Sequence, residues 1–346
     1  MMSIRARLAG LAAAAVLAVA GQASAQTAPP DTVAAIRARG HLICGVAVNA
    51  PGFALPDSRG EFRGLDVDTC RAVAAAVLGD ATKVRFVPNT TVQRFPMLQS
   101  GELDILVRNT TWSMARETQL GLAFAGINFY DGQGFMVRRS SNVTSARQLD
   151  GATICVQPGT TTELNLTDYF RTNNMRFTPV VIEQAEEIRA AFVAGRCDAY
   201  TNDASSLASF RATRTTDANE FVLLPEIISK EPLGPAVRQG DDKWFSIVRW
   251  TLFALIEAEE LGITKDNAEA GLTSANPAIK RFLGAEGDSG QQLGLDPRWA
   301  YNVISKVGNY GEIFERNLGQ SSQLKIDRGI NAQWNAGGLM YAPPVR

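Results

Sequence analysis

Charged and hydroxyl side chains follow a short apolar segment in each half of the chain. In the first half, Thr111 and Arg116 come after the apolar segment 103–107. In the second half, Asp203 comes after the segment 197–200. A guanidinium forms two parallel hydrogen bonds with a carboxylate, and an aspartate can bind an ammonium group. Each residue also has an ordinary structural use, Arg116 as a surface charge and Asp203 as the N-cap of a helix.

Both apolar segments belong to a unit that occurs twice, at 95–107 and at 188–200. Each copy consists of an amphipathic helix, a glycine and a short buried strand. Gly101 and Gly195 suit the left-handed residue that closes a helix. In open α/β sheets, ligands bind at the carboxyl ends of the strands. Two such ends, one in each half, therefore predict two lobes that face each other across one small polar ligand.

A further candidate lies where a helix is expected to begin after the strand 153–156. Thr160 and Thr161 stand at this point. Threonine can cap a helix, and the first N–H groups of a helix together with its dipole form an anion site. The alternative is a plain helix cap. The segment is not a phosphate-binding P-loop, because the Gly-Lys-Ser/Thr sequence is missing.

Two aromatic side chains, Phe53 and Trp112, are candidate walls for a ligand side chain, although most aromatic residues are core. The acidic pair within 65–68 could hold a metal, but we expect one member to cap a helix predicted at 69–78. No metal site is therefore expected. The single histidine, His41, lacks partners for a catalytic triad and is interpreted as structural.

The first 25 residues have the pattern of a secretory signal peptide. Arg5 and Arg7 precede the short apolar run Leu8–Ala20, and Ala23–Ala25 is a small-residue cleavage site. No later stretch is apolar for long enough to predict a transmembrane helix. Without its signal the chain has 32 basic and 35 acidic residues, a net charge of about −3. This balance gives no reason to expect nucleic-acid binding, which needs a basic surface.

Four cysteines in an exported protein predict two disulfides, for which three pairings are possible. Cys44 and Cys70 lie in the first half, and Cys155 and Cys197 lie in the second. We expect the pairs 44–70 and 155–197, because pairing within each half places no bridge across a moving joint.

About 320 residues are more than one hydrophobic core usually serves, so two lobes are expected. Strand and helix patterns alternate, which implies mostly parallel sheets flanked by helices. Two strands cross between the lobes and form a hinge. The Gly-rich stretch 276–297 is expected to be a loop. The predicted boundaries are 26–135 and 236–346 for lobe 1, with a C-terminal extension at about 319–346, and 136–235 for the inserted lobe 2.

The chain resembles the periplasmic solute-binding proteins of polar-amino-acid ABC transporters, and within them the general L-amino-acid-binding group. The resemblance covers nearly the whole mature chain and implies the two-lobed type II periplasmic-binding-protein fold. The stretches that carry it are 64–74, 98–102, 108–112, 130–137, 159–166 and 195–201.

The resemblance implies a role for each candidate residue. Arg116 and Thr111 would hold the ligand α-carboxylate, with further donors from Thr161 and the neighbouring Thr160. Asp203 would bind the α-ammonium group. Asn109 would offer its backbone carbonyl to the same ammonium group. The first loop departs from the group's pattern, and Phe53 is assigned there as the residue that contacts the ligand side chain.

The function implied is that of a monomeric periplasmic binding protein, without cofactor or catalysis. It would deliver L-amino acids of broad range to the membrane permease of an ABC importer. The alternative is an exported enzyme on the same scaffold, similar to cyclohexadienyl or arogenate dehydratases. A sensory domain is disfavoured, because no transmembrane or signalling segment follows the lobes.

Overall fold

Two five-stranded sheets hold the candidate residues. The computed structural model describes residues 31–214 and 217–345, so the predicted signal peptide at 1–25 lies outside the described residues. The first sheet has the order β4-β1-β5-β14-β6. β1 is parallel to β4 and β5, whereas β14 is antiparallel to β5 and β6. The strands are β1 (Leu42–Ala47), β4 (Val84–Asn89), β5 (Ile105–Leu106), β6 (Leu122–Phe124) and β14 (Ala236–Arg238).

The second sheet repeats this plan with the order β10-β9-β11-β8-β12. β9 is parallel to β10 and β11, and β8 is antiparallel to β11 and β12. Its strands are β8 (Gln133–Arg138), β9 (Thr153–Val156), β10 (Thr178–Val181), β11 (Ala199–Asp203) and β12 (Phe221–Leu223). Each sheet is therefore mixed: two of its four strand pairings are parallel and two are antiparallel, which is more antiparallel pairing than the alternating pattern predicted.

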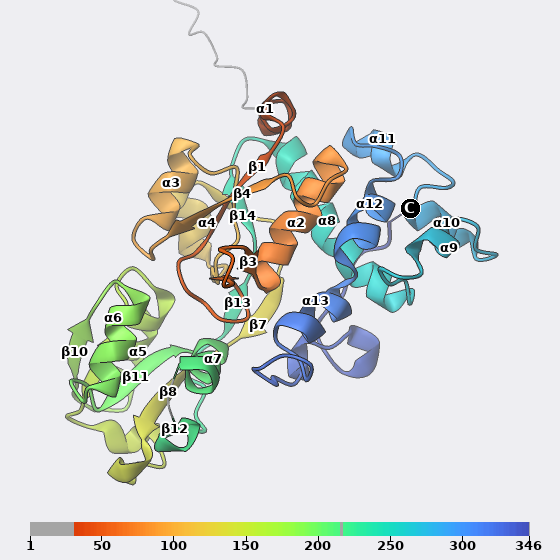
Figure 1. The fold of residues 1–346 in the computed structure, drawn as a ribbon. Helices are drawn as coiled ribbons and strands as arrows, with labels where there is room; N and C mark the ends of the chain where they lie inside the picture. The colour runs from red at the N-terminus through yellow and green to blue at the C-terminus, as the bar shows by residue number, and fades with distance from the viewer. Residues whose placement is uncertain (1–30, 215–216, 346) are drawn as a thin grey trace, which may run out of the picture. The chain divides into compact units, whose positions relative to one another are not determined.

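Two antiparallel strands connect the sheets. β7 (Phe129–Asp131) pairs with β13 (Glu231–Leu233). β7 is followed by β8 of the second sheet, and β13 is followed by β14 of the first. The chain thus leaves the first sheet once and returns once, which confirms the expected two-lobed architecture with two connecting strands (Figure 1).

Helices cover both sheets (Figure 1). α2 (Leu65–Leu78) packs on β1, and α8 (Asp242–Glu260) packs on α2. No helix among the described residues is both long and apolar enough to cross a membrane. The other helices of the first half are α1 (Thr32–Arg39), α3 (Arg94–Ser100) and α4 (Met114–Leu120). Those beside the second sheet are α5 (Thr161–Thr172), α6 (Ala185–Val193) and α7 (Ala204–Arg214).

The helix predicted at 69–78 begins four residues earlier than expected. Its N-cap is Gly64, whose φ of 138° suits glycine. The aspartates at 66 and 68 therefore lie in the first turn and do not cap the helix. At these positions their negative charges still interact favourably with the positive end of the helix dipole.

The C-terminal part is more helical than the sequence suggested. The stretch 276–297, expected to be a loop, contains α10 (Pro277–Phe282) and α11 (Ser289–Leu293). Asn276 caps α10 by accepting a hydrogen bond from Ala278 N, and Pro277 occupies the first helical position, where it lacks no needed donor. The remaining helices are α9 (Ala268–Gly271), α12 (Trp299–Val307) and α13 (Tyr310–Asn317).

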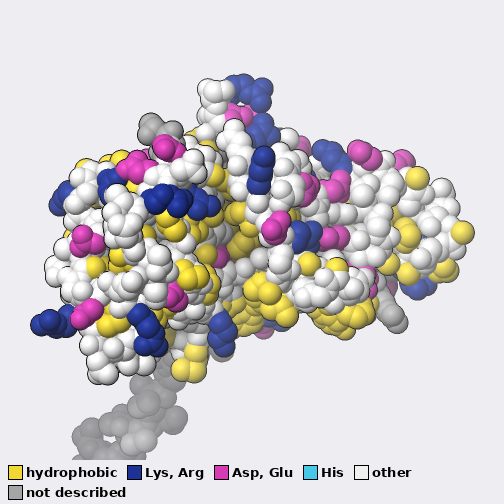
Figure 2. All heavy atoms as spheres, turned by 90° about the horizontal axis from the view of Figure 1, so that it is seen from below, with side chains coloured by type: hydrophobic (Ala, Val, Ile, Leu, Met, Phe, Trp, Pro, Cys, Tyr) yellow, Lys and Arg dark blue, Asp and Glu magenta, His cyan; other side chains and the backbone are white. Residues whose placement is uncertain are grey.

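The tail after Gly319 is held by hydrogen bonds to the connecting strand and to α8. Asn331 accepts a hydrogen bond from Tyr130 N at 2.7 Å and donates one to Tyr130 O at 3.0 Å. Gln333 donates to Ile256 O at 2.8 Å. On the face shown in Figure 2, acidic and basic side chains are interspersed, in keeping with the small net charge.

The predicted disulfides are both present. Cys44 on β1 pairs with Cys70 on α2, with 6.3 Å between their Cα atoms, and Cys155 pairs with Cys197 at 5.6 Å. Each bridge joins a central strand to the segment that packs on it. Neither bridge connects the two sheets.

Removing either disulfide should destabilise the protein through the entropy of the unfolded chain. The bridges close separations of 26 and 42 residues. In the chain-entropy model these loops are worth about 3.5 and about 4 kcal/mol. Urea unfolding of the Cys44→Ser/Cys70→Ser and Cys155→Ser/Cys197→Ser double variants measures both losses. Unchanged unfolding free energies would contradict this prediction.

Candidate ligand-binding site

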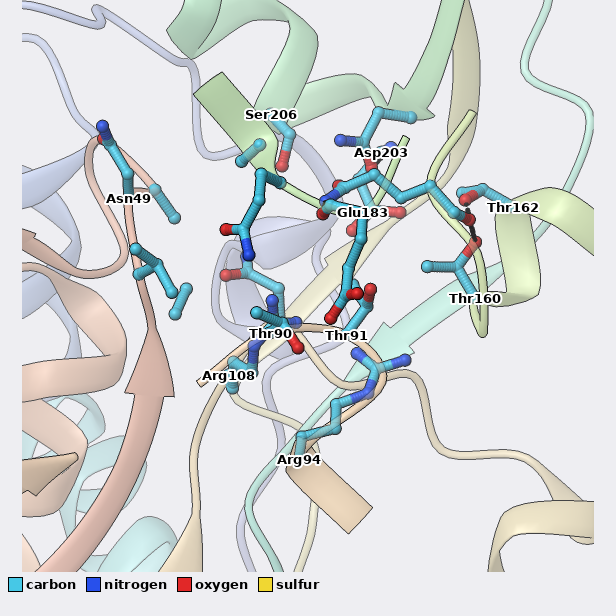
Figure 3. Close-up of a pocket in the computed structure, with 18 of the residues that line it drawn as sticks. Asn49, Thr90, Thr91, Arg94, Arg108, Thr160, Thr162, Glu183, Asp203 and Ser206 are labelled. Carbon is cyan, nitrogen blue, oxygen red and sulfur yellow. Dashed lines mark hydrogen bonds between the residues drawn. The ribbon is translucent and has the colours of Figure 1, made fainter. Parts of the chain in front are cut away.

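A cavity lies where strands of both sheets reach their carboxyl ends. It comprises about 710 Å³ of empty space, part of it open to solvent. Residues that follow β1, β4, β5, β9, β10 and β11 contribute to its lining. In Figure 3, Arg94 and Arg108 lie on one side, and Asp203 and Ser206 lie on the opposite side. The predicted residues that line the cavity are Asn109, Thr111, Arg116, Thr160, Thr161 and Asp203.

Arg116 is a buried cation in the first turn of α4. Ser113 caps this helix and accepts a hydrogen bond from Arg116 N at 3.4 Å. The guanidinium donates to Thr111 O at 2.8 Å and lies 5.1 Å from the centre of the Phe95 ring. Burial lowers the pKa of Arg116, while the carboxylates of Glu231 and Asp203 oppose this change. No carboxylate of a described residue forms an ion pair with it, so the guanidinium keeps donors for a ligand.

Asp203 ends β11 and supplies a buried carboxyl group to the same cavity. Burial, followed by the charges of Asp131 and Glu231, raises the pKa of Asp203 well above its ordinary value. No hydrogen bond from a described residue reaches its carboxylate. The N-cap alternative is not realised, because Asp131 accepts the hydrogen bonds of Ser205 N and Ser205 Oγ at the start of α7. The Asp203 carboxylate is therefore available to a cationic group.

The start of α5 lies beside Arg94, which donates a hydrogen bond to Gly159 O at 3.0 Å. Thr160 is the N-cap and accepts a hydrogen bond from Glu163 N at 3.1 Å. Thr161 follows as the first helical residue, with its hydroxyl 3.3 Å from the hydroxyl of Thr111. The plain helix cap is therefore present. A capped helix start still has N–H groups without a partner inside the helix, so the anion site stays a prediction.

Glu231 of β13 was not predicted from the sequence, although it organises both walls. It is 1% exposed. One carboxylate oxygen accepts hydrogen bonds from Thr111 at 2.5 Å and from Thr161 at 2.8 Å. The other oxygen accepts from Asn165 at 2.8 Å and from Ser229 at 2.6 Å. A single carboxylate on the connecting strand thus holds hydroxyls from both lobes.

Asn109 is placed by the carboxylate of Asp66. Its backbone has a φ of 38°, in the left-handed region that asparagine tolerates better than most residues. Asn109 N donates to Asp66 at 3.0 Å, and Asn128 donates to the second oxygen of Asp66 at 3.1 Å. Burial raises the pKa of Asp66 to about 6. Asp66 therefore supports the loop that carries the site.

The structure does not bring Phe53 and Trp112 to the cavity, contrary to the expectation. Phe53 is 1% exposed and packs edge-to-face on Phe129 in the core. The Trp112 ring stacks on Phe124 and donates a hydrogen bond to Glu117 at 2.7 Å. Both rings are held by contacts from other elements, which a local pattern does not report.

Three further arginines line the cavity and were missed: Arg94, Arg108 and Arg189. Arg108 lies two residues after β5 and Arg94 lies five residues after β4, so the rule of strand ends could have found both. Arg189 lies within α6 and pairs with Glu186 at 3.0 Å. The strand-end rule gives no signal for Arg189.

The fold, with Arg116 and Asp203 lining one cavity, defines a two-lobed protein that binds a small solute between its sheets. The chain belongs to the bacterial extracellular solute-binding proteins, family 3, whose family model matches residues 42–266. Its fold is the type II periplasmic-binding-protein fold.

Relatives extend the likeness to the C-terminal helices. The chain is 58% identical to the general L-amino acid-binding periplasmic protein AapJ of Rhizobium johnstonii over 96% of its length and 97% of that protein. It is 56% identical to the glutamate/glutamine/aspartate/asparagine-binding protein BztA of Rhodobacter capsulatus, over 95% and 96% of the two chains. A solved periplasmic binding protein from Brucella ovis with glutathione bound is similar with a TM-score of 0.89 and 57% identity, over 92% of this chain and 100% of that one.

Replacing Asp203 by asparagine should stabilise the ligand-free protein at high pH only. A carboxyl whose pKa is raised by folding contributes stability at low pH that is lost as the pH rises through the raised value. The Tm of Asp203→Asn should therefore match the wild type near pH 4 and exceed it near pH 8. Thermal unfolding without ligand measures the difference, with the exposed Asp266→Asn as control. The same Tm difference at both pH values would refute the assigned sign.

Proposed function

We propose that this protein binds an L-amino acid in the cavity between its lobes, by the two charged ends of the ligand. Arg116 holds the α-carboxylate together with N–H groups at the start of α5, next to Thr160 and Thr161. Asp203 holds the α-ammonium group, and the carbonyl of Asn109 adds an acceptor. The observation that carries the proposal is that Arg116 and Asp203 line one cavity and neither is ion-paired to another described residue.

The charges of Arg116 and Asp203 are matched to the two charges of a zwitterion. Burying an unpaired charge is costly, and pairing it with a ligand charge recovers part of that cost. A dissociation constant in the micromolar range needs about −8 kcal/mol. Two charge-assisted contacts in a cavity that excludes water can supply most of this energy.

In this proposal the hydroxyls of Thr111 and Thr161 do not donate to the ligand α-carboxylate, which is the role that the resemblance implied for them. Each hydroxyl has one hydrogen to donate, and both donate to Glu231. While these bonds hold, the two hydroxyls offer only their lone pairs to the ligand. The two hydroxyls then serve to join the walls of the cavity. The α-carboxylate of the ligand is bound by Arg116 and by backbone N–H donors.

The protein works in the periplasm as a monomer and presents its bound amino acid to the permease of an ABC importer. The membership in this family and the similarity to AapJ and BztA support this role. Among the described residues, lobe 1 comprises 31–135 and 236–345, and lobe 2 comprises 136–214 and 217–235. β7 and β13 form the hinge. The ligand favours the closed form, because only that form lets both lobes contact it.

The protein binds its ligand without converting it. The alternative is a dehydratase similar to those that act on prephenate or arogenate, with Glu163 or Asp203 as acid or base. Support for binding comes from the relatives, which are named as binding proteins. Incubation with prephenate and with arogenate, followed by chromatography, tests the choice, and turnover would overturn it.

Loss of the Arg116 charge should remove most of the affinity for every amino acid. Truncating one partner of a buried charge pair costs about 2–5 kcal/mol, so Arg116→Met should weaken binding by at least about 30-fold. Calorimetric titration with the amino acids that the wild type binds measures this loss, and the exposed Arg85→Met serves as control. Wild-type affinity in Arg116→Met would refute the carboxylate role.

Loss of the Asp203 charge should act on the ammonium end of the ligand alone. Asp203→Asn should weaken an α-amino acid by about 10-fold or more, and its deaminated analogue by far less. The comparison uses the same ligand pair on the wild type and the variant. An equal loss for both ligands would show that Asp203 does not contact the ammonium group.

A further inference from the structure

We propose that Glu231 is a positioning residue that holds the two lobes closed without contacting the ligand, so that it raises the affinity for every ligand by one common factor. Glu231 together with its two partners on α5, Thr161 and Asn165, is called the latch below. The inference rests on the proposed function and adds how the same site is regulated.

The strand that carries Glu231 is tied to lobe 1 by its backbone. Trp112 N donates a hydrogen bond to Pro232 O at 2.8 Å, and Thr111 and Leu233 form an antiparallel bridge. The Glu231 carboxylate adds the hydrogen bond from the Thr111 hydroxyl at 2.5 Å. Glu231 therefore keeps its place beside lobe 1 when the lobes move apart.

Lobe 2 reaches the same carboxylate through two side chains of α5. Thr161 donates to one oxygen at 2.8 Å, and Asn165 donates to the other oxygen at 2.8 Å. Residues four apart lie on one face of a helix, so α5 presents both donors together. Opening of the lobes breaks these two bonds. The bond from Ser229 survives opening, because Ser229 lies two residues before Glu231 in the chain.

The latch is complete without a ligand. Neither Glu231 nor Asn165 belongs to the described residues that line the cavity. Glu231 is 1% exposed, and its two oxygens accept four hydrogen bonds from the protein. A buried carboxylate with this many donors is satisfied. Asp203 differs in this respect, because no hydrogen bond from a described residue reaches its carboxylate.

Two further side chains make contacts between the lobes, and each contributes less than the latch. Asn49 donates to Glu186, whose side chain is 55% exposed, and contacts of exposed charges stabilise little. Arg94 makes one bond, to Gly159 O, and it also lines the cavity. The latch makes two bonds to one buried charged acceptor. Each such bond is worth a factor of about 10 in an equilibrium constant.

These contacts act on affinity through the closed fraction of the ligand-free protein. The apparent affinity for a ligand that needs the closed form is its intrinsic affinity multiplied by the closed fraction. A bond that raises this fraction therefore strengthens the binding of all ligands equally. It also slows their release, because opening has to break it. The latch thus supplies affinity that does not depend on the side chain of the amino acid.

The test removes one bond of the latch and leaves the cavity lining intact. Asn165→Ala is compared with the wild type, and Asp168→Ala on the exposed face of α5 is the control. The probes are those of L-glutamine, L-alanine, L-leucine and L-histidine that the wild type binds. Asn165→Ala should weaken each of them by about the same factor, about 10-fold. Stopped-flow kinetics should assign this loss to faster dissociation, with association rates within about twofold.

Two further measurements separate closure from a general loss of structure. Small-angle X-ray scattering of the ligand-free proteins should give a larger radius of gyration for Asn165→Ala than for the wild type, while their melting curves stay alike. In Glu231→Leu, which removes the shared acceptor, the added Asn165→Ala change should cost less than about twofold, because the two residues act as one pair.

The outcomes distinguish the latch from the proposed function. Wild-type affinities in Asn165→Ala would overturn the latch and leave amino-acid binding intact. Losses that differ several-fold between the probes would show that this pair contacts the ligand, which refutes a common factor. An unchanged radius of gyration in ligand-free Asn165→Ala would refute the effect on closure. A wild type that binds no amino acid would overturn the proposed function together with this inference.

Discussion

The binding site depends on buried charges that have no ion-pair partner among the described residues. Arg116 and its neighbours Arg94 and Arg108 are cations on one wall, and Asp203 is an anion on the other. Each raises the free energy of the ligand-free protein, because a buried charge loses its hydration. The two sheets, the disulfides and the helix caps keep these groups in place at that cost. The same groups then gain most from a ligand that brings the opposite charges.

Glu231 explains how the two walls can meet without a ligand. Its carboxylate lies on β13 and accepts hydroxyl hydrogens from Thr111 and Thr161. Arg94 adds a hydrogen bond to Gly159 O across the same interface. Neither contact neutralises Asp203 or Arg116. The walls are thus joined by polar contacts beside the charges, and the charges themselves remain for the ligand.

Local patterns were sufficient to predict the two-lobed α/β architecture and part of the site, but not the helices α10 and α11. The repeated helix-glycine-strand unit led to Arg116 and Asp203, since the ends of parallel strands gather at one edge of a sheet. Glu231 could not be found in this way, because its partners lie 120 and 70 residues away in the sequence. Phe53 and Trp112 were misplaced for the same reason, since their packing against Phe129 and Phe124 is a long-range contact.

A crystal structure of the protein with bound L-glutamate tests the central claim most directly. The account predicts α-carboxylate oxygens within about 3 Å of the Arg116 guanidinium and the α-ammonium nitrogen within about 3 Å of an Asp203 oxygen. A ligand bound outside this cavity, or bound with neither charged end on Arg116 and Asp203, would contradict the account.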